Sequence, residues 1–106
     1  MKKHIPDWLI VTLCRALLGE IYPSIRCIAI KYTEEKILFI RYYLDRMPTD
    51  MDYESMEVLA TDISVETGLD LNLIKGIEID CQFSSSPIGK IDPLDGFVYA
   101  RREYDI

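Results

Sequence analysis

Two β-rich runs lie close together near the middle of the chain and constrain its fold more than any other feature. Residues Ile25–Tyr32 and Ile37–Leu44 are dominated by β-branched, aromatic and other apolar side chains, a composition typical of strands. Only Thr33-Glu34-Glu35-Lys36 separates them, which is the length of a hairpin link. The runs therefore predict a β-hairpin, although the link lacks the glycine that is common in such turns.

A helix is predicted before this hairpin, over Pro6–Ile21. Pro6 suits the first turn because its missing amide donor is not needed there, and Asp7 interacts favourably with the positive end of the helix dipole. Trp8 lies on the least apolar side, either at the margin of the core or as an exposed anchor. Helical spacing predicts one broad buried face, formed by Ile10, Leu13, Cys14, Leu17, Leu18 and Ile21.

A second helix is predicted after the hairpin. Thr49 or Asp50 provides its cap, it runs to about Thr67, and Gly68 ends it. Its acids are expected to lie outside the stripe that faces the core. That inward stripe is predicted to consist of Tyr53, Met56, Leu59, Ala60 and Ile63.

The last third of the chain adds two strands. A segment from about Ile74 to Phe83 alternates, which predicts a half-buried strand whose inward residues are Ile77, Ile79, Cys81 and Phe83. A long connection, 84–96, is either functional or mobile, and a last strand runs from Phe97 to about Arg102. The order α-β-β-α-β-β predicts an α+β fold with two helices packed on a four-stranded antiparallel or mixed sheet. With 106 residues, we expect a single domain over 1–106.

Charge is distributed unevenly along the chain. The net charge is −6, and the segment from Asp45 to Glu66 accounts for all of it, with seven acids and one base. The longest internal basic pair is Arg101-Arg102, so the chain lacks the basic stripe that direct binding of nucleic acid requires. The acidic segment instead favours a positively charged protein as the partner.

Cysteine usage indicates the redox compartment. Cys14, Cys27 and Cys81 are odd in number, widely spaced and set among apolar residues, unlike a disulfide framework or a zinc site. We therefore expect buried free thiols in a reducing cytosol.

The N-terminus superficially resembles a signal peptide. Lys2 and Lys3 precede an apolar stretch, but Pro6-Asp7 and Arg15 interrupt it and no small-residue cleavage site follows. The stretch is also too short to span a bilayer. We expect a cytoplasmic protein that is not inserted in a membrane, with a secretory signal as the alternative.

Few residues are suited to catalysis or to holding a cofactor. His4 is the only histidine, so histidine-dependent triads and multi-histidine metal sites have no other residue to use. Asp50, Asp52 and Glu54 alternate somewhat like a calcium loop, but no glycine or final glutamate follows in register. We expect no enzyme, no cofactor and no metal site, and two converging carboxylates are the one catalytic alternative.

The second helix also carries the candidate interaction surface. Val58 and Val65 lie two turns apart on its outward side, and two valines in an acidic field are unusual for a surface that meets only solvent. A covering loop or C-terminal tail is the alternative. Of the adjacent strand residues Tyr42 and Tyr43, one must face away from the helices. The predicted partner-binding residues are Asp50, Glu54, Glu57, Val58, Asp62, Val65 and Tyr43.

Three segments carry a resemblance to a known family: Ala16–Arg26, Phe39–Asp45 and the acidic segment Asp50–Asp62. Over roughly Leu13–Glu66 the chain resembles small bacterial immunity proteins that accompany polymorphic or contact-dependent growth-inhibition toxins. The resemblance implies a cytoplasmic antitoxin that binds one cognate toxin domain, often a nuclease, and blocks its active site or its access to substrate. It implies no role for an individual residue.

The residue pattern and the resemblance predict the same function, which is tight one-to-one inhibition of a basic toxin. The acidic helix is expected to supply the electrostatic part of binding through Asp50, Glu54, Glu57 and Asp62. Two alternatives stay open: a non-catalytic adaptor subunit of a larger assembly, and a carboxylate-dependent hydrolase. An unprotected edge strand would permit either self-association or addition of a strand from the partner, and the pattern favours neither.

Overall fold

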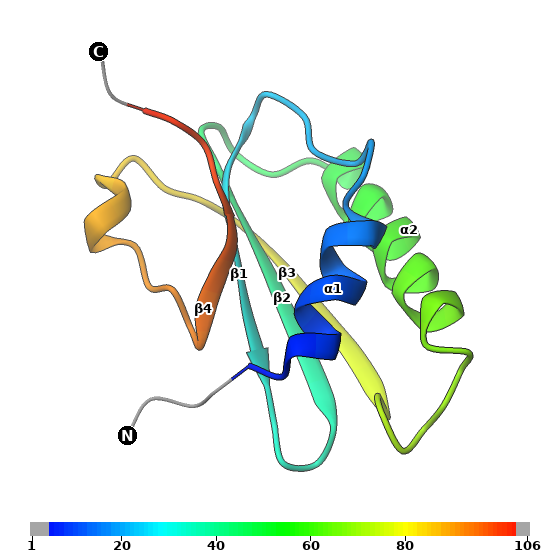
Figure 1. The fold of residues 1–106 in the computed structure, drawn as a ribbon. Helices are drawn as coiled ribbons and strands as arrows, with labels where there is room; N and C mark the ends of the chain where they lie inside the picture. Colours follow the sequence, from blue (N-terminus) through cyan, green and yellow to red (C-terminus); the bar gives the residue numbers. More distant parts are fainter. Residues whose placement is uncertain (1–4, 104–106) are drawn as a thin grey trace.

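A computed structural model describes residues 5–103 and shows two helices on one side of a four-stranded sheet (Figure 1). The predicted α+β architecture is confirmed, with a short 3-10 helix added to the predicted order between the last two strands. The elements are α1 (Asp7–Ala16), β1 (Ile25–Tyr32), β2 (Ile37–Leu44), α2 (Asp50–Glu66), β3 (Gly76–Phe83), η1 (Ile88–Lys90) and β4 (Gly96–Ala100).

The sheet is mixed and has the strand order β3-β2-β1-β4. β1 pairs antiparallel with both β2 and β4. β2 and β3 are parallel because α2 carries the chain back to the starting end of the sheet before β3 begins. Of the two predicted alternatives, the mixed sheet is therefore correct, and β3 and β4 form its edges.

The hairpin of β1 and β2 has the bounds predicted from sequence. Lys36 adopts the left-handed conformation, φ 68°, that a glycine would otherwise supply in the turn. The Thr33 amide donates to the Ile37 carbonyl at 3.0 Å, and the Ile37 amide donates to the Thr33 hydroxyl at 3.1 Å. A lysine in a strained conformation thus closes the turn with support from both ends of the link.

α2 begins after Thr49 and ends near Gly68, as predicted. The Thr49 amide donates to the Asp52 carboxylate at 2.7 Å, which satisfies a backbone donor at the start of the helix. Gly68 has φ 67° and follows the last turn. The expectation that all acids lie outside the buried stripe is wrong for Asp52, which is buried because Arg46 and Tyr22 bind its carboxylate.

The buried face of α1 differs from the predicted one. The helix ends at Ala16, and Gly19, with φ 80°, turns the chain, so the helical spacing does not extend to Leu18 and Ile21. Ile10, Cys14, Leu18 and Ile21 are exposed, whereas Leu9, Thr12, Leu13 and Leu17 are buried. Packing against α2 and the sheet sets this face, and helical periodicity alone placed it about one residue too far along the chain.

Trp8 lies at the margin of the core, the first of its two predicted positions. Its ring packs edge-on against Tyr32 with 5.8 Å between ring centroids, and it is partly buried against the main core. The Tyr32 hydroxyl in turn donates to the Leu73 carbonyl. This contact joins α1, β1 and the connection that precedes β3.

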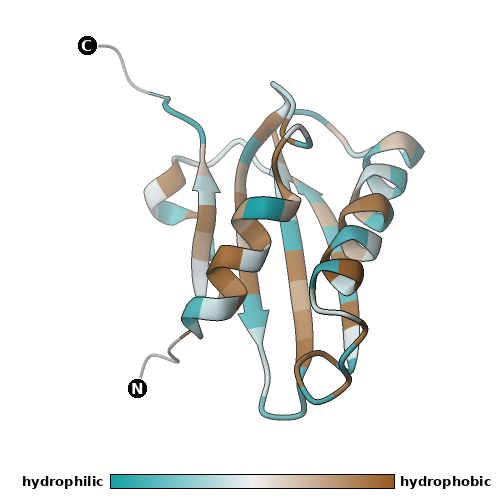
Figure 2. Ribbon diagram, turned by 45° about the vertical axis from the view of Figure 1, so that its right-hand side comes forward, coloured by the Kyte–Doolittle hydropathy of each residue, from teal (hydrophilic) through white to brown (hydrophobic). Residues whose placement is uncertain are grey.

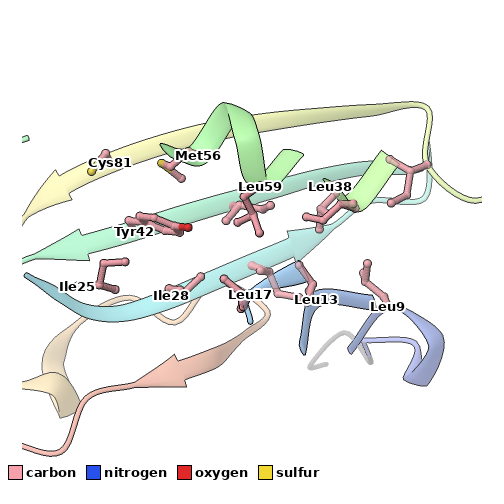
Figure 3. Packing of buried hydrophobic residues seen from close by; sticks show 14 of the residues in the cluster. Leu9, Leu13, Leu17, Ile25, Ile28, Leu38, Tyr42, Met56, Leu59 and Cys81 are labelled. Atoms are coloured by element: carbon pink, nitrogen blue, oxygen red, sulfur yellow. The ribbon is translucent and has the colours of Figure 1, made fainter. Parts of the chain in front are cut away.

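The main core lies between the helices and the sheet (Figure 3). Leu38, Ile40, Tyr42 and Leu44 of β2 share the face that the helices cover, and all are fully buried. Met56 and Leu59 of α2 pack against these residues from the helix side of the sheet. The Tyr42 hydroxyl finds no hydrogen-bond partner within residues 5–103, which leaves a polar atom unsatisfied in an apolar core.

The connection 84–96 covers the opposite face of the sheet. Ile88, Ile91 and Leu94 pack on Cys27, Ala29 and Tyr43 in a second, smaller core. The Arg26 guanidinium anchors the connection by donating to the carbonyls of Ser84 and Ser86 at 2.8 and 2.7 Å. This structure gives the long connection a packing role.

Two further expectations about burial are wrong. Phe83 and Tyr53, both predicted to face inward, are 46% and 38% exposed because they lie at the open edge of the sheet. Cys14 is exposed, whereas Cys27 and Cys81 are buried free thiols.

None of the helices in the described part of the chain is long and apolar enough to cross a membrane.

Candidate partner-binding face

The outward side of α2 carries the largest concentration of negative charge that the fold does not neutralise. The helix contains six acids and no base. Asp52 and Glu66 are paired with Arg46 and Arg15 at 2.7 and 3.1 Å. The other four are exposed and make no ion pair within the described chain; they are Asp50, Glu54, Glu57 and Asp62.

An apolar seam runs along this acidic face, with Asp62 on one side and the other three acids on the other. Met51, Val58 and Val65 recur every seven residues, two turns apart, so they line up along the helix. Their side chains are 76%, 51% and 67% exposed. The sequence identified both valines; Met51 was missed, although the same spacing from Val58 could have revealed it. Nothing within residues 5–103 covers the seam.

The apolar surface continues beyond the end of α2. Leu69 and Leu71 are largely exposed in the connection to β3, which is mostly brown in Figure 2. Together with Val65 and Ile77 they line a groove of about 400 Å³ between α2 and the start of β3. The sequence pattern did not single out this groove, because it joins residues from a helix, a turn and a strand.

Residues 6–103 match the family model described as MafI2 immunity protein. The chain belongs to the MafI2 immunity protein family. The match extends past the segment Leu13–Glu66 that carried the resemblance, and includes β3, η1 and β4. Comparison with curated proteins finds no match. As an immunity protein, the chain acts by binding a cognate toxin.

Tyr43, the remaining predicted partner-binding residue, is nearly inaccessible in this immunity protein. Of the two adjacent tyrosines, Tyr43 is the one that faces away from the helices, but the connection 84–96 covers it and leaves 4% of the residue exposed. Its hydroxyl donates to the Asp92 carbonyl at 2.8 Å, and Arg41 donates to the same hydroxyl at 3.2 Å. We therefore leave Tyr43 out of the interface proposed below and assign it to packing.

Asp52, the most buried acid among residues 5–103, has the wrong electrostatics for acid catalysis. The Arg46 guanidinium, assisted by Tyr22 and Thr49, lowers the pKa of Asp52 well below its ordinary value despite the burial. A carboxylate-dependent hydrolase needs one acid with a raised pKa. His4, the only histidine, lies outside the described residues.

Proposed function

We propose that this immunity protein neutralises its cognate toxin by binding it one-to-one with the outward face of α2. The observation that carries this proposal is the arrangement of four unpaired acids around an exposed apolar seam. The interface consists of Asp50, Met51, Glu54, Glu57, Val58, Asp62 and Val65. It acts by occupation of the toxin surface and involves no catalysis by the immunity protein.

Charge and apolar contact have different roles in this interface. Charges that are unpaired in the free protein are available to accelerate encounter with a positive surface. Side chains such as Val58 and Val65 exclude water from the complex and slow its dissociation. Acids that flank a valine seam therefore suit a partner that is basic and has an apolar centre.

The proposed toxin is a nuclease of a polymorphic or contact-dependent growth-inhibition system. A nuclease surface that binds phosphates is positively charged, and α2 offers four carboxylates that can replace those phosphates. The cytoplasm is the proposed compartment, since all three cysteines are free thiols and such thiols persist under reducing conditions.

A pull-down of the tagged immunity protein from its native lysate tests this function. The column is washed at increasing salt, and the retained partner is identified by mass spectrometry. We expect a basic toxin domain whose activity is abolished by one equivalent of the immunity protein. Recovery of only a housekeeping assembly would contradict the proposal and favour an adaptor subunit.

A further inference from the structure

The outer side of β3 is an open sheet edge. β2 lies on one side of β3, and no strand of residues 5–103 lies on the other. The final turns of α2 border this edge (Figure 1). An edge strand presents unpaired N–H and C=O groups that can pair with a strand from another chain.

The hydrogen bonds identify which backbone groups of β3 are available. Directly after β3, the Ser84 amide donates to the Leu44 carbonyl of β2 at 3.1 Å, so even-numbered residues pair with β2. On the outer side, the Tyr53 hydroxyl donates to the Cys81 carbonyl at 3.3 Å. Within β3, the backbone groups of odd-numbered residues therefore point outward, whereas the Lys75 amide, directly before the strand, still donates to the Lys36 carbonyl at 2.8 Å. Apart from Cys81, whose carbonyl is bound by Tyr53, the outward-pointing residues beside the groove are Ile77 and Ile79.

The apolar groove lies beside these free backbone groups. Its walls include Thr61, Ser64 and Val65 of α2 and Ile77 of β3. In a strand, alternate side chains point to opposite faces of the sheet. Alternate side chains of a strand added beside β3 would therefore enter the groove under α2, where apolar groups are preferred.

The remaining side chains of an added strand would meet negative charge. On the face of β3 that points away from the helices, Glu78 is exposed and Asp80 is partly exposed beside Arg41. A strand in which apolar residues alternate with lysine or arginine complements both faces.

Building on the function proposed above, we infer that an extended segment of the cognate toxin adds as a strand to the outer edge of β3. Its apolar side chains fill the groove under α2, and its basic side chains lie beside Glu78. The groove is continuous with the outward face of α2, because Val65 belongs to both. One toxin surface can therefore engage the acidic helix and the sheet edge together.

A second copy of the immunity protein fits this edge poorly. Two antiparallel copies of β3 paired around Ile79 would bring the exposed Glu78 of each chain beside Asp80 of the other, where Arg41 is the only paired base among the described residues. Like charges on adjacent strands destabilise their pairing, and each chain carries a net charge of −6. Charge thus favours the basic toxin as the occupant.

Amide hydrogen exchange, followed by NMR on the full chain, tests strand addition directly. The probe is the toxin domain recovered in the pull-down and expressed separately. The Ile77 and Ile79 amides are expected to exchange fast in the free protein and to slow by about tenfold or more in the complex. The Glu78 and Asp80 amides, which face β2, serve as internal references.

Each outcome of the exchange experiment is decisive. A complex in which both isoleucine amides stay fast would overturn strand addition and leave the α2 interface intact. A toxin domain that does not bind overturns the proposed function together with this inference. Slow exchange in the free protein, combined with a dimeric mass in solution, would place a second copy at the edge and also contradict the inference.

A variant that fills the groove provides a second test. Ser64→Trp places a large side chain in the groove and leaves the outward acids of α2 unchanged; Ser85→Trp, in the exposed connection after β3, is the matched control. We expect Ser64→Trp to raise the Kd for the toxin domain by about tenfold or more. Equal Kd values for the two folded variants would count against strand addition.

Discussion

The Arg46 guanidinium forms two hydrogen bonds with the buried Asp52 carboxylate, at 2.7 and 3.0 Å. Tyr22 donates to the same carboxylate at 2.5 Å. Asp52 also accepts the Thr49 amide at the start of α2. One charged group therefore joins the turn after α1, the end of β2 and the helix that carries the proposed interface.

Asp52→Asn is expected to destabilise the protein and to flatten its acid sensitivity. The folded state holds the pKa of Asp52 below its ordinary value of 3.8, so its stabilisation is present above about pH 4 and is lost as pH falls toward the folded value. At pH 7 we expect a loss of about 1 kcal/mol or more, the usual effect of removing a helix cap. Urea unfolding at pH 7 and pH 3 measures both effects. If the difference in free energy of unfolding between wild type and variant does not shrink at pH 3, the stabilising role of the Asp52 carboxylate is contradicted.

Tyr42→Phe is expected to leave stability unchanged or to raise it by about 1 kcal/mol, because the hydroxyl is buried without a partner. The neighbouring Tyr43→Phe is the matched control. It removes the bond to the Asp92 carbonyl and should cost about 1 kcal/mol. Chemical denaturation of both variants checks this order, and a larger loss for Tyr42→Phe would contradict it.

The three cysteines are expected to differ in reactivity. Burial raises the pKa of the Cys27 thiol to about 11 and that of the Cys81 thiol to about 12, so neither forms much thiolate near neutral pH. Cys14 is exposed. Brief treatment of the folded protein with iodoacetamide should add one label, located at Cys14 by peptide mass spectrometry, and unfolded protein should take three. Rapid labelling of Cys27 would show that the second core opens readily.

Local patterns predicted the strands better than they predicted the face of α1. The alternation in β2 is complete within eight residues, so Leu38, Ile40, Tyr42 and Leu44 could be assigned to one face without knowledge of the rest of the chain. The face of α1 depends on where α2 packs. Helical spacing alone therefore predicted the burial of Leu13 and Leu17 correctly but also predicted that Ile10 and Leu18 are buried, and both are exposed.

Long-range contacts explain what the sequence did not predict about the site. Asp52 is buried because it meets Tyr22, thirty residues earlier, and Tyr43 is buried by the connection around Asp92. The other five acids and the two valines of α2 were predicted correctly as exposed, because one helical repeat determines their side. The groove required the fold, since Leu71 and Ile77 approach Val65 only after β3 joins the sheet.

Val58→Ser and Val65→Ser are expected to weaken toxin binding without loss of stability. Both valines are exposed by half or more, so the substitutions cost little core packing. Each substitution removes apolar area from the proposed interface. We expect the Kd to rise by about five- to tenfold per substitution, mainly through faster dissociation. Surface plasmon resonance measures the loss of affinity, and thermal unfolding checks that stability is unchanged. The exposed Val11 of α1, changed to Ser, is the control, and an equal loss of affinity there would contradict a local effect.

The most direct test of the proposed interface is the toxin affinity of Glu54→Lys/Glu57→Lys, measured by titration calorimetry at low and high salt. Glu34→Lys/Glu35→Lys, in the exposed hairpin link, makes the same change of charge elsewhere. We predict that reversal on α2 raises the Kd by about 100-fold and reduces its salt dependence, while the hairpin variant changes the Kd no more than a few-fold. Wild-type affinity and unchanged salt dependence for the folded α2 variant would contradict the proposal that this acidic face binds the toxin.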